Sequence, residues 1–147
     1  MILFTQLHYG VFNMSSSLFI EKQKKLYKSL KPCFCPAIQS TVYFNSDGLN
    51  HLLYDKHRPR NHKEKHYRVA LIDHITDVIT KSPKATQENF VNPPTQLWIL
   101  DYVEIEDDKK QKHSIKVILR KKGNGNVHFW SVMQKRCNNG KKRKTQT

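Results

Sequence analysis

Histidine, arginine and hydroxyl side chains stand at positions from which they could act together on one phosphate group. His51 lies in a helix-like stretch, Arg120 near the end of a strand-like stretch, and Ser131 in the strand-like stretch that follows. Histidine exchanges a proton near neutral pH, and a guanidinium binds phosphate through two parallel hydrogen bonds. Breaking a phosphodiester without a metal needs a proton carrier and fixed positive charge. These three residues are therefore our first catalytic candidates.

Arg68 and His128 extend this set of catalytic candidates. Arg68 comes four residues before Ile72, at the margin of a helical apolar face, so it either leans over the sheet or is solvated. His128 is a reserve proton carrier. We expect binding of phosphates and bases from a wider group of cationic and aromatic residues: Arg58, Arg60, Lys116, Lys121, Lys122 and Phe129.

The histidines do not predict a metal site. His62 and His66 have i, i+4 spacing, but Lys63 stands where a zinc-protease motif has glutamate, and no third ligand is evident. Gly123-x-Gly125 alone is a hairpin turn and not a nucleotide-binding loop. We therefore expect neither metal nor cofactor.

The charge of the chain points to a polyanionic partner. Its 147 residues contain 26 Lys and Arg against 12 Asp and Glu, a formal net charge of +14. Such an excess repels itself in a folded protein, and binding to nucleic acid offsets that repulsion. No stretch approaches the ~20 apolar residues of a membrane span. Met1–Phe12 lacks the features of a signal peptide, and Met14 offers an alternative start.

The cysteines indicate a reducing compartment. Cys33, Cys35 and Cys137 form neither an even disulfide set nor two separated zinc-binding pairs. We expect free thiols and a cytoplasmic location.

Helices are expected in the first half of the chain. Residues 1–40 read as a basic extension that is partly helical or disordered, with a short basic helix ending before Pro32. Ser46 is a fair N-cap for a helix carrying Leu49, Leu52 and Leu53. Asn61 followed by Glu64 resembles a capping box, and the helix it opens should end near Ser82-Pro83.

Three strands should follow, at residues 97–106, 114–120 and 127–133, as an antiparallel meander. Residues 42–44 are a fourth strand or the lead into a helix. The expected class is α+β, with N-terminal helices packed on a three- to four-stranded antiparallel sheet. Residues 41–134 should form the single domain and residues 135–147 a disordered basic tail.

The turn at Asn124-Gly125 sets the strand register. A type I′ turn there pairs Arg120 with Phe129 and Ile118 with Ser131, which places Trp130 in the core and Phe129 on the open face. A one-residue bulge would instead bring His128 beside Arg120. Either register gives a cationic surface with a proton-handling or hydrogen-bonding neighbour.

Several runs resemble a known group of proteins. They are Val-Tyr-Phe-Asn-Ser-x-Gly-x-x-His-Leu-Leu (42–53), Arg-Pro-Arg (58–60), Ile-Lys-Val-Ile-Leu-Arg (115–120) and Gly-Asn-Gly-Asn-Val-His-Phe-Trp-Ser-Val-Met (123–133). This pattern resembles short uncharacterised bacterial proteins and, more distantly, the barnase–EndoU–colicin–RelE group of metal-independent ribonucleases, including its phage-associated members. The resemblance implies a helix histidine at His51, a strand arginine at Arg120 and a hydroxyl at Ser131.

Three functions are consistent with these patterns. The first is a toxin-type endoribonuclease that cuts tRNA or mRNA by attack of the 2′-hydroxyl; the resemblance also implies an antitoxin or immunity protein as partner. The second is a non-catalytic, ribosome-associated RNA-binding module, which needs the basic face but no histidine near the phosphate. The third is a DNA-binding regulator, which the lack of a clear helix-turn-helix pair disfavours.

Overall fold

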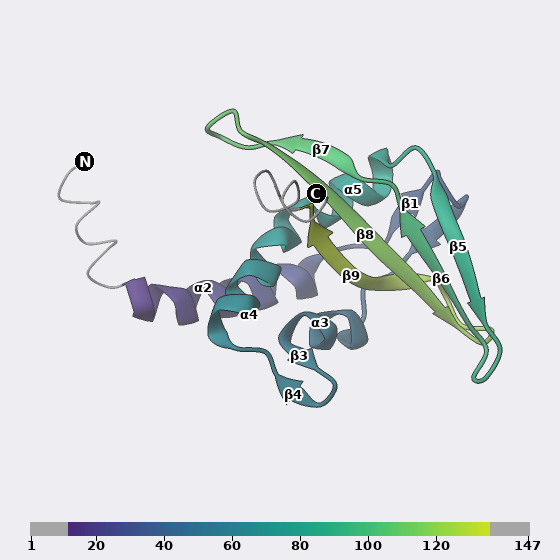
Figure 1. Cartoon of the computed structure of the whole chain (residues 1–147), viewed down its shortest axis with the longest axis horizontal. Coiled ribbons are helices and arrows are strands. Elements are labelled where there is room, and N and C mark those ends of the chain that lie inside the picture. The colour runs from purple at the N-terminus through teal and green to yellow at the C-terminus, as the bar shows by residue number, and fades with distance from the viewer. Residues whose placement is uncertain (1–11, 136–147) are drawn as a thin grey trace, which may run out of the picture.

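The computed structural model describes residues 12–135, which combine helices with antiparallel sheets and confirm the α+β class (Figure 1). The elements in chain order are α2 (Phe12–Ser29), β1 (Cys33–Cys35), β2 (Ser40–Val42), α3 (Ser46–Leu53), β3 (Tyr54–Asp55), β4 (Arg58–Pro59), α4 (His62–Ala70), the 3₁₀ helix η1 (Leu71–His74), α5 (Ile75–Lys81), β5 (Ala85–Phe90), β6 (Thr95–Leu100), β7 (Val103–Glu106), β8 (Lys112–Lys122) and β9 (His128–Gln134). Within residues 12–135, no helix is long and apolar enough to cross a membrane. The predicted tail from residue 136 lies outside the described residues.

Asparagine side chains start the two helices that frame the site. Asn45 caps α3 by accepting hydrogen bonds from the backbone N–H groups of Asp47 and Gly48, so the cap lies one residue before the predicted Ser46. Asn61 caps α4 as predicted, accepting from the Glu64 N–H at 2.8 Å.

The long helix predicted to end near Ser82 is divided by η1 into α4 and α5. Its apolar face is nevertheless continuous, because Val69, Ile72, Ile75, Val78 and Ile79 are all buried. The 3.6-residue spacing predicted a face made of Tyr67, Leu71, Ile75, Val78 and Ile79, and all of these except the half-buried Tyr67 are buried. The spacing did not predict the tighter turn of η1.

The main sheet is a meander around β8, extended by one strand. β6 and β7 pair with the same edge of β8, β9 pairs with the other edge, and β5 adds to β6. The strand predicted at residues 97–106 is thus two strands, interrupted at Asp101–Tyr102. β5 occupies a segment that we expected to be a loop.

Residues 42–44 do not supply the fourth strand. Val42 ends β2, which pairs only with β1, and Tyr43 forms a single parallel bridge to His128. This bridge leads the chain along the outer edge of β9 and directly into α3.

A β-bulge sets the faces of β9. Ile118 pairs with Ser131 as the turn-based register predicted, but Leu119 pairs with Phe129, which leaves Trp130 as the extra residue. The alternative register, with His128 opposite Arg120, is therefore correct at the turn end, although the extra residue lies in β9 and not in the glycine turn. The predicted faces of Phe129 and Trp130 are wrong and exchanged: Phe129 is fully buried, and Trp130 is half-buried on the other face.

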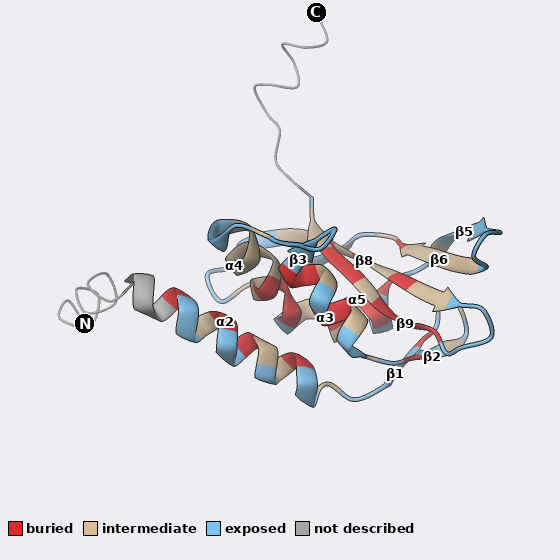
Figure 2. Ribbon diagram, turned by 90° about the horizontal axis from the view of Figure 1, so that it is seen from below, coloured by how far each residue is buried: buried red, intermediate tan, exposed pale blue. Residues whose placement is uncertain are grey.

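The core lies between the helices and one face of this sheet, where Figure 2 shows buried residues concentrated on α3, α5, β8 and β9. Ile115, Val117 and Leu119 contribute the β8 side of this core, as predicted. α2 also joins it, because Ile20, Gln23 and Tyr27 are buried. The opposite side, which we call the open face, carries Lys116, Ile118, Arg120 and Lys122, because side chains alternate along a strand.

Gly48 lets α3 approach the free edge of β9. A Cβ atom at this position would lie 2.7 Å from the Phe129 carbonyl oxygen and 2.6 Å from the Tyr27 hydroxyl. Such distances exclude any side chain without movement of the backbone, so glycine is required for this close contact. The close approach brings Asp47 and His51, which flank Gly48 on α3, over the open face.

Candidate functional site

A cleft of about 580 Å³ opens where α3 and the β3–β4 hairpin meet the open face. Its lining combines two histidines, two cations, two aromatic rings, an amide and one carboxylate. These residues are Asp47, Asn50, His51, Tyr54, His57, Arg120, Lys122 and Trp130. Two of the predicted catalytic residues, His51 and Arg120, thus line one cavity although they are far apart in sequence.

His51 is held against Trp130. The two rings stack with centroids 4.2 Å apart and planes inclined by 23°. Burial, aided by the positive charges of Arg60, Arg68 and Arg120, lowers the pKa of His51 to about 4. The imidazole is therefore neutral at physiological pH, with a nitrogen able to accept a proton.

Arg120 packs against the same indole. Its Cζ atom lies 3.5 Å from the centre of the Trp130 ring, a cation–π contact that restrains the guanidinium. Its Nη2 donates to Asp47 Oδ2 at 3.3 Å, and Lys122 Nζ reaches the same oxygen at 3.4 Å. The imidazole of His51 and the guanidinium of Arg120 therefore both contact the Trp130 ring.

Asp47 occupies the place where an anionic ligand would meet these cations. Its carboxylate bridges Arg120 and Lys122, and it is the acidic residue among the eight that line the cleft. The side chain of Asp47 is 42% exposed, so solvent screens its ion pairs and they are individually weak. The cleft therefore keeps excess positive charge.

Arg60 and Arg68 lie behind His51 and outside the cleft lining. Arg60 donates from Nε and Nη2 to the His51 carbonyl oxygen at 3.3 and 3.1 Å, which fixes the C-terminal end of α3. Arg68 pairs with Glu64 at 2.7 Å. Arg68 is thus ion-paired, and its influence reaches His51 through charge. Both residues contribute to the electrostatics of the site.

A second, smaller cleft of about 320 Å³ lies on the other side of the β3–β4 hairpin. Arg58 and Arg60 line it together with Asp55, Pro59, Asn61 and Glu64. The structure therefore places the predicted Arg-Pro-Arg cations beside the main cleft and not inside it.

The last strand departs from our expectations for three residues. Ser131 is 2% exposed and Phe129 is fully buried, so neither surface is available to a ligand. His128 lies opposite Arg120 but is 6% exposed, and burial lowers the pKa of its imidazole. Within residues 12–135, neither His128 Nε2 nor Arg120 Nε, both buried, has a hydrogen-bond partner. The bulge at Trp130 turns Phe129 into the core, whereas Ser131 is buried although it keeps its predicted partner Ile118.

The lysines of β8 lie on two different faces of the sheet, because side chains alternate along a strand. Lys122 lines the cleft, whereas Lys121 pairs with Gln96 and lies on the opposite side of the strand. Lys116 is on the open face four residues from Arg120, with Nζ 5.0 Å from the centre of the Tyr102 ring. Only Lys122 among these three cations belongs to the cleft.

His57 and Tyr54 are cleft residues that sequence reasoning missed. They belong to the β3–β4 hairpin, whose two turn residues, Lys56 and His57, have φ of 50° and 72°. A type I′ turn needs positive φ at both positions, and Asn-Gly is its usual sequence. Lys-His carries no such signal. A non-glycine pair held in this strained conformation is common at functional sites.

Within residues 12–135, no three His, Cys, Asp or Glu side chains gather in a way that could hold a metal ion. His62 and His66 instead contact one serine: Ser16 Oγ lies 2.7 Å from His62 Nε2 and 2.9 Å from His66 Nδ1. This contact joins α2 to α4.

Comparisons of this chain with protein-family models, curated proteins and solved structures gave no match.

Proposed function

We propose that this chain is a metal-independent endoribonuclease whose active site is the cleft between α3, the β3–β4 hairpin and the open face. The observation that supports it most is the packing of neutral His51 and cationic Arg120 on one indole at an open, positively charged cavity. A proton acceptor beside a fixed guanidinium is the minimum set for attack of a 2′-hydroxyl on the adjacent phosphorus.

His51 would act as the general base. With a pKa of about 4 it is a weak base, but a bound phosphate would bring negative charge close to it and raise that pKa toward neutrality. The imidazole would take the 2′-hydroxyl proton as the 2′-oxygen bonds to phosphorus. The bond from phosphorus to the 5′-oxygen then breaks, which leaves a 2′,3′-cyclic phosphate.

His57 is the best placed candidate for the general acid. The leaving 5′-oxygen needs a proton as its bond to phosphorus breaks, and His57 is the second histidine of the cleft lining. It comes from the hairpin, whereas His51 comes from α3, so the two can approach a phosphate from different sides. Tyr54 of the same hairpin is 45% exposed and offers a ring on which an unpaired base can stack.

Arg120 and Lys122 would stabilise the negative charge of the phosphorane. Both contact the Asp47 carboxylate, and phosphate oxygens would replace that carboxylate on binding. A guanidinium already held against Trp130 loses little freedom in this exchange, so it would be preorganised for the transition state.

A test compares purified wild-type protein with His51→Ala and Arg120→Ala on mixed tRNA and mRNA in EDTA. We expect cleavage by the wild type and a loss of at least ~100-fold in each variant, the usual scale for a general base or a charge-stabilising group. Matched controls are His74→Ala on η1 and Lys121→Ala, the neighbouring cation on the opposite side of β8. Intact RNA with every preparation of folded wild type would contradict the proposal.

A non-catalytic RNA-binding module is the second candidate. The low pKa of His51 favours it, because a weak base gives little catalysis unless a bound phosphate raises that pKa. Salt-sensitive binding of RNA without any product would support this reading.

Cellular context follows from the proposed activity. Cys33 and Cys35 are free thiols, in keeping with the reducing cytoplasm where tRNA and mRNA are available. A toxin of this kind would need an antitoxin or immunity protein, and an acidic surface covering the cleft would serve that purpose.

A further inference from the structure

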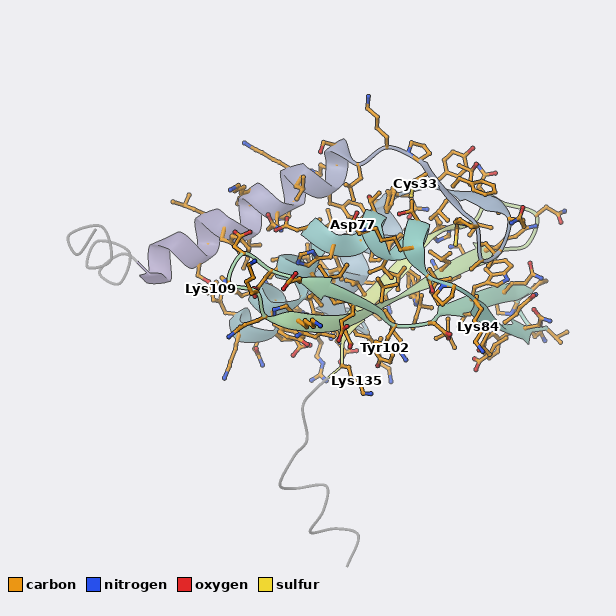
Figure 3. All side chains as sticks on the ribbon, turned by 90° about the horizontal axis from the view of Figure 1, so that it is seen from above. Cys33, Asp77, Lys84, Tyr102, Lys109 and Lys135 are labelled. Carbon is orange, nitrogen blue, oxygen red and sulfur yellow. The ribbon has the colours of Figure 1, made fainter. Side chains whose placement is uncertain are left out.

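A second group of cations and an aromatic ring lies on the open face, at the other end of β8 from the cleft. Tyr102 stands in the break between β6 and β7, with its side chain 40% exposed. Lys116 Nζ lies 5.0 Å and Lys135 Nζ 5.9 Å from the centre of its ring. Figure 3 shows Tyr102 and Lys135 together on the side of the sheet away from α2.

We infer that Tyr102, Lys116 and Lys135 form a second binding site for single-stranded RNA, which stacks one base and contacts its neighbouring phosphates. This inference rests on the proposed ribonuclease function, since it concerns the same RNA strand that enters the cleft. An exposed tyrosine between lysines is the combination by which proteins hold unpaired bases without reading their sequence.

The position of the site fits a continuous path for one strand. Lys116 and Arg120 are four residues apart on β8 and on the same face, a separation of about 13 Å. A few nucleotides bridge that length. Between them lie Ile118 and its partner Ile99, both half-buried, which offer apolar surface to sugars and bases.

The site lies at the start of a basic run of sequence. Asp101, the residue before Tyr102, and Glu104, opposite Ser114, are the acidic neighbours of the two lysines. Lys135 is also the last described residue. The sequence that follows it contains five more cations, namely Arg136, Lys141, Lys142, Arg143 and Lys144.

A duplex would satisfy this site less well than a single strand. Stacking on Tyr102 requires an unpaired base, because the faces of paired bases are covered by their neighbours. The site would therefore favour loops and single-stranded regions of RNA and would set the distance from a bound base to the bond that is cut.

The test compares Tyr102→Ala and Tyr102→Phe with wild type on a long single-stranded RNA and on a dinucleotide that spans the cleavage site. We expect Tyr102→Ala to raise the KM for the long RNA on the order of tenfold. The dinucleotide should be cleaved as by wild type, because it cannot reach Tyr102. Tyr102→Phe, which keeps the ring, should behave as wild type. Phe34→Ala, at an exposed aromatic residue on β1, is the matched control.

The outcomes separate the two proposals. Equal KM values for wild type and Tyr102→Ala on the long RNA, with cleavage intact, would overturn the second site and leave the ribonuclease proposal standing. Failure of folded wild type to cut either substrate would overturn the ribonuclease proposal and this inference with it. Binding of a 2′-O-methylated copy of the long RNA, which cannot be cut, should weaken in Tyr102→Ala and show a smaller salt dependence in Lys116→Ala/Lys135→Ala.

Discussion

Replacement of Gly48 by alanine sets two well-known effects against each other. In a helix, alanine is more favourable than glycine by about 1 kcal/mol, so helix propensity alone predicts a more stable protein. The structure predicts the opposite, because the new Cβ would lie 2.6 Å from Phe129 Cδ2, 2.6 Å from Tyr27 Oη and 2.7 Å from the Phe129 carbonyl oxygen. The backbone contact is decisive, since a carbonyl within a paired strand cannot rotate away.

The expected cost can be assigned from these contacts. Overpacking of a buried site typically costs 1–3 kcal/mol, and loss of the 2.7 Å hydrogen bond from Tyr27 to the Asn45 carbonyl costs about 1 kcal/mol more. Together these exceed the propensity gain, so we expect net destabilisation of about 1–3 kcal/mol. Urea denaturation of the wild type and Gly48→Ala measures this difference.

The same replacement should also impair the site. To restore ordinary contact of 3.4 Å with the Phe129 oxygen, α3 must move by about 0.7 Å, which displaces His51 and Asp47 from Arg120. Misplacement of a catalytic group by about 1 Å can cost on the order of 100-fold in rate, so RNA cleavage should fall by ten- to a hundredfold.

A double variant tests the cause of this destabilisation. In a Tyr27→Phe background one of the three close contacts is absent, so Gly48→Ala should cost less there than in the wild type. A Gly48→Ala protein that is more stable than wild type and cleaves RNA at the wild-type rate would show that the position of α3 does not depend on this close approach.

Three further predictions concern charge, pH and the attachment of α2. Asp47→Asn should bind a non-cleavable RNA several-fold more tightly at low salt by fluorescence anisotropy, because it frees Arg120 and Lys122; weaker binding would contradict the assigned role of Asp47. The free energy of unfolding should rise between about pH 4 and 6.5, because the pKa of His51 is about 4 in the folded protein and near 6.5 in the unfolded chain, so acid favours the unfolded state. Urea denaturation across this pH range should show a smaller rise in His51→Gln than in wild type. Equal rises in the two proteins would rule out His51 as the origin. Ser16→Ala should lower the unfolding free energy by about 1–2 kcal/mol, because it leaves His62 and His66 without their shared hydroxyl; an unchanged urea midpoint would show that this contact adds no stability.

Strong local signals predicted most of the elements. Asn61 was recognisable as a helix cap, and the apolar run at 114–120 marked the buried face of β8, although the strand extends two residues further at each end. β5 was not recognisable, because Thr86 to Asn89 are polar and exposed, and an edge strand of this kind has no buried face to produce alternation. The basic stretch of α2 gave the helix but did not indicate how closely Ile20 and Tyr27 pack in the core.

The register of β9 shows where counting from a turn fails. Alternation is reliable only while each residue has one partner, and here the extra residue Trp130 leaves the predicted pairs beyond it intact but changes those of His128 and Phe129, between the turn and the bulge. Phe129 and Trp130 are adjacent, aromatic and equally suited to a core, so their sequence does not mark the slip. Trp130, the residue that stacks on His51, was therefore predicted on the wrong face of the sheet.

The site was predictable only where residue chemistry was enough. His51 and Arg120 were identified because a helix histidine and a strand arginine suit phosphate chemistry. Asp47 and His57 were missed because their positions depend on tertiary contacts, namely the docking of α3 on β9 and a positive-φ turn without glycine. Such contacts join distant segments and produce no periodic pattern in the sequence.

The most direct test of the proposed function uses one RNA in two forms, unmodified and fully 2′-O-methylated, incubated with the protein in EDTA. We expect wild type to cut only the unmodified strand and to give products that end in 2′,3′-cyclic phosphate and 5′-hydroxyl groups, and we expect His51→Ala to lower the rate at least ~100-fold. Cleavage of the methylated strand, or cleavage of the unmodified strand by folded His51→Ala at the wild-type rate, would contradict the proposed function.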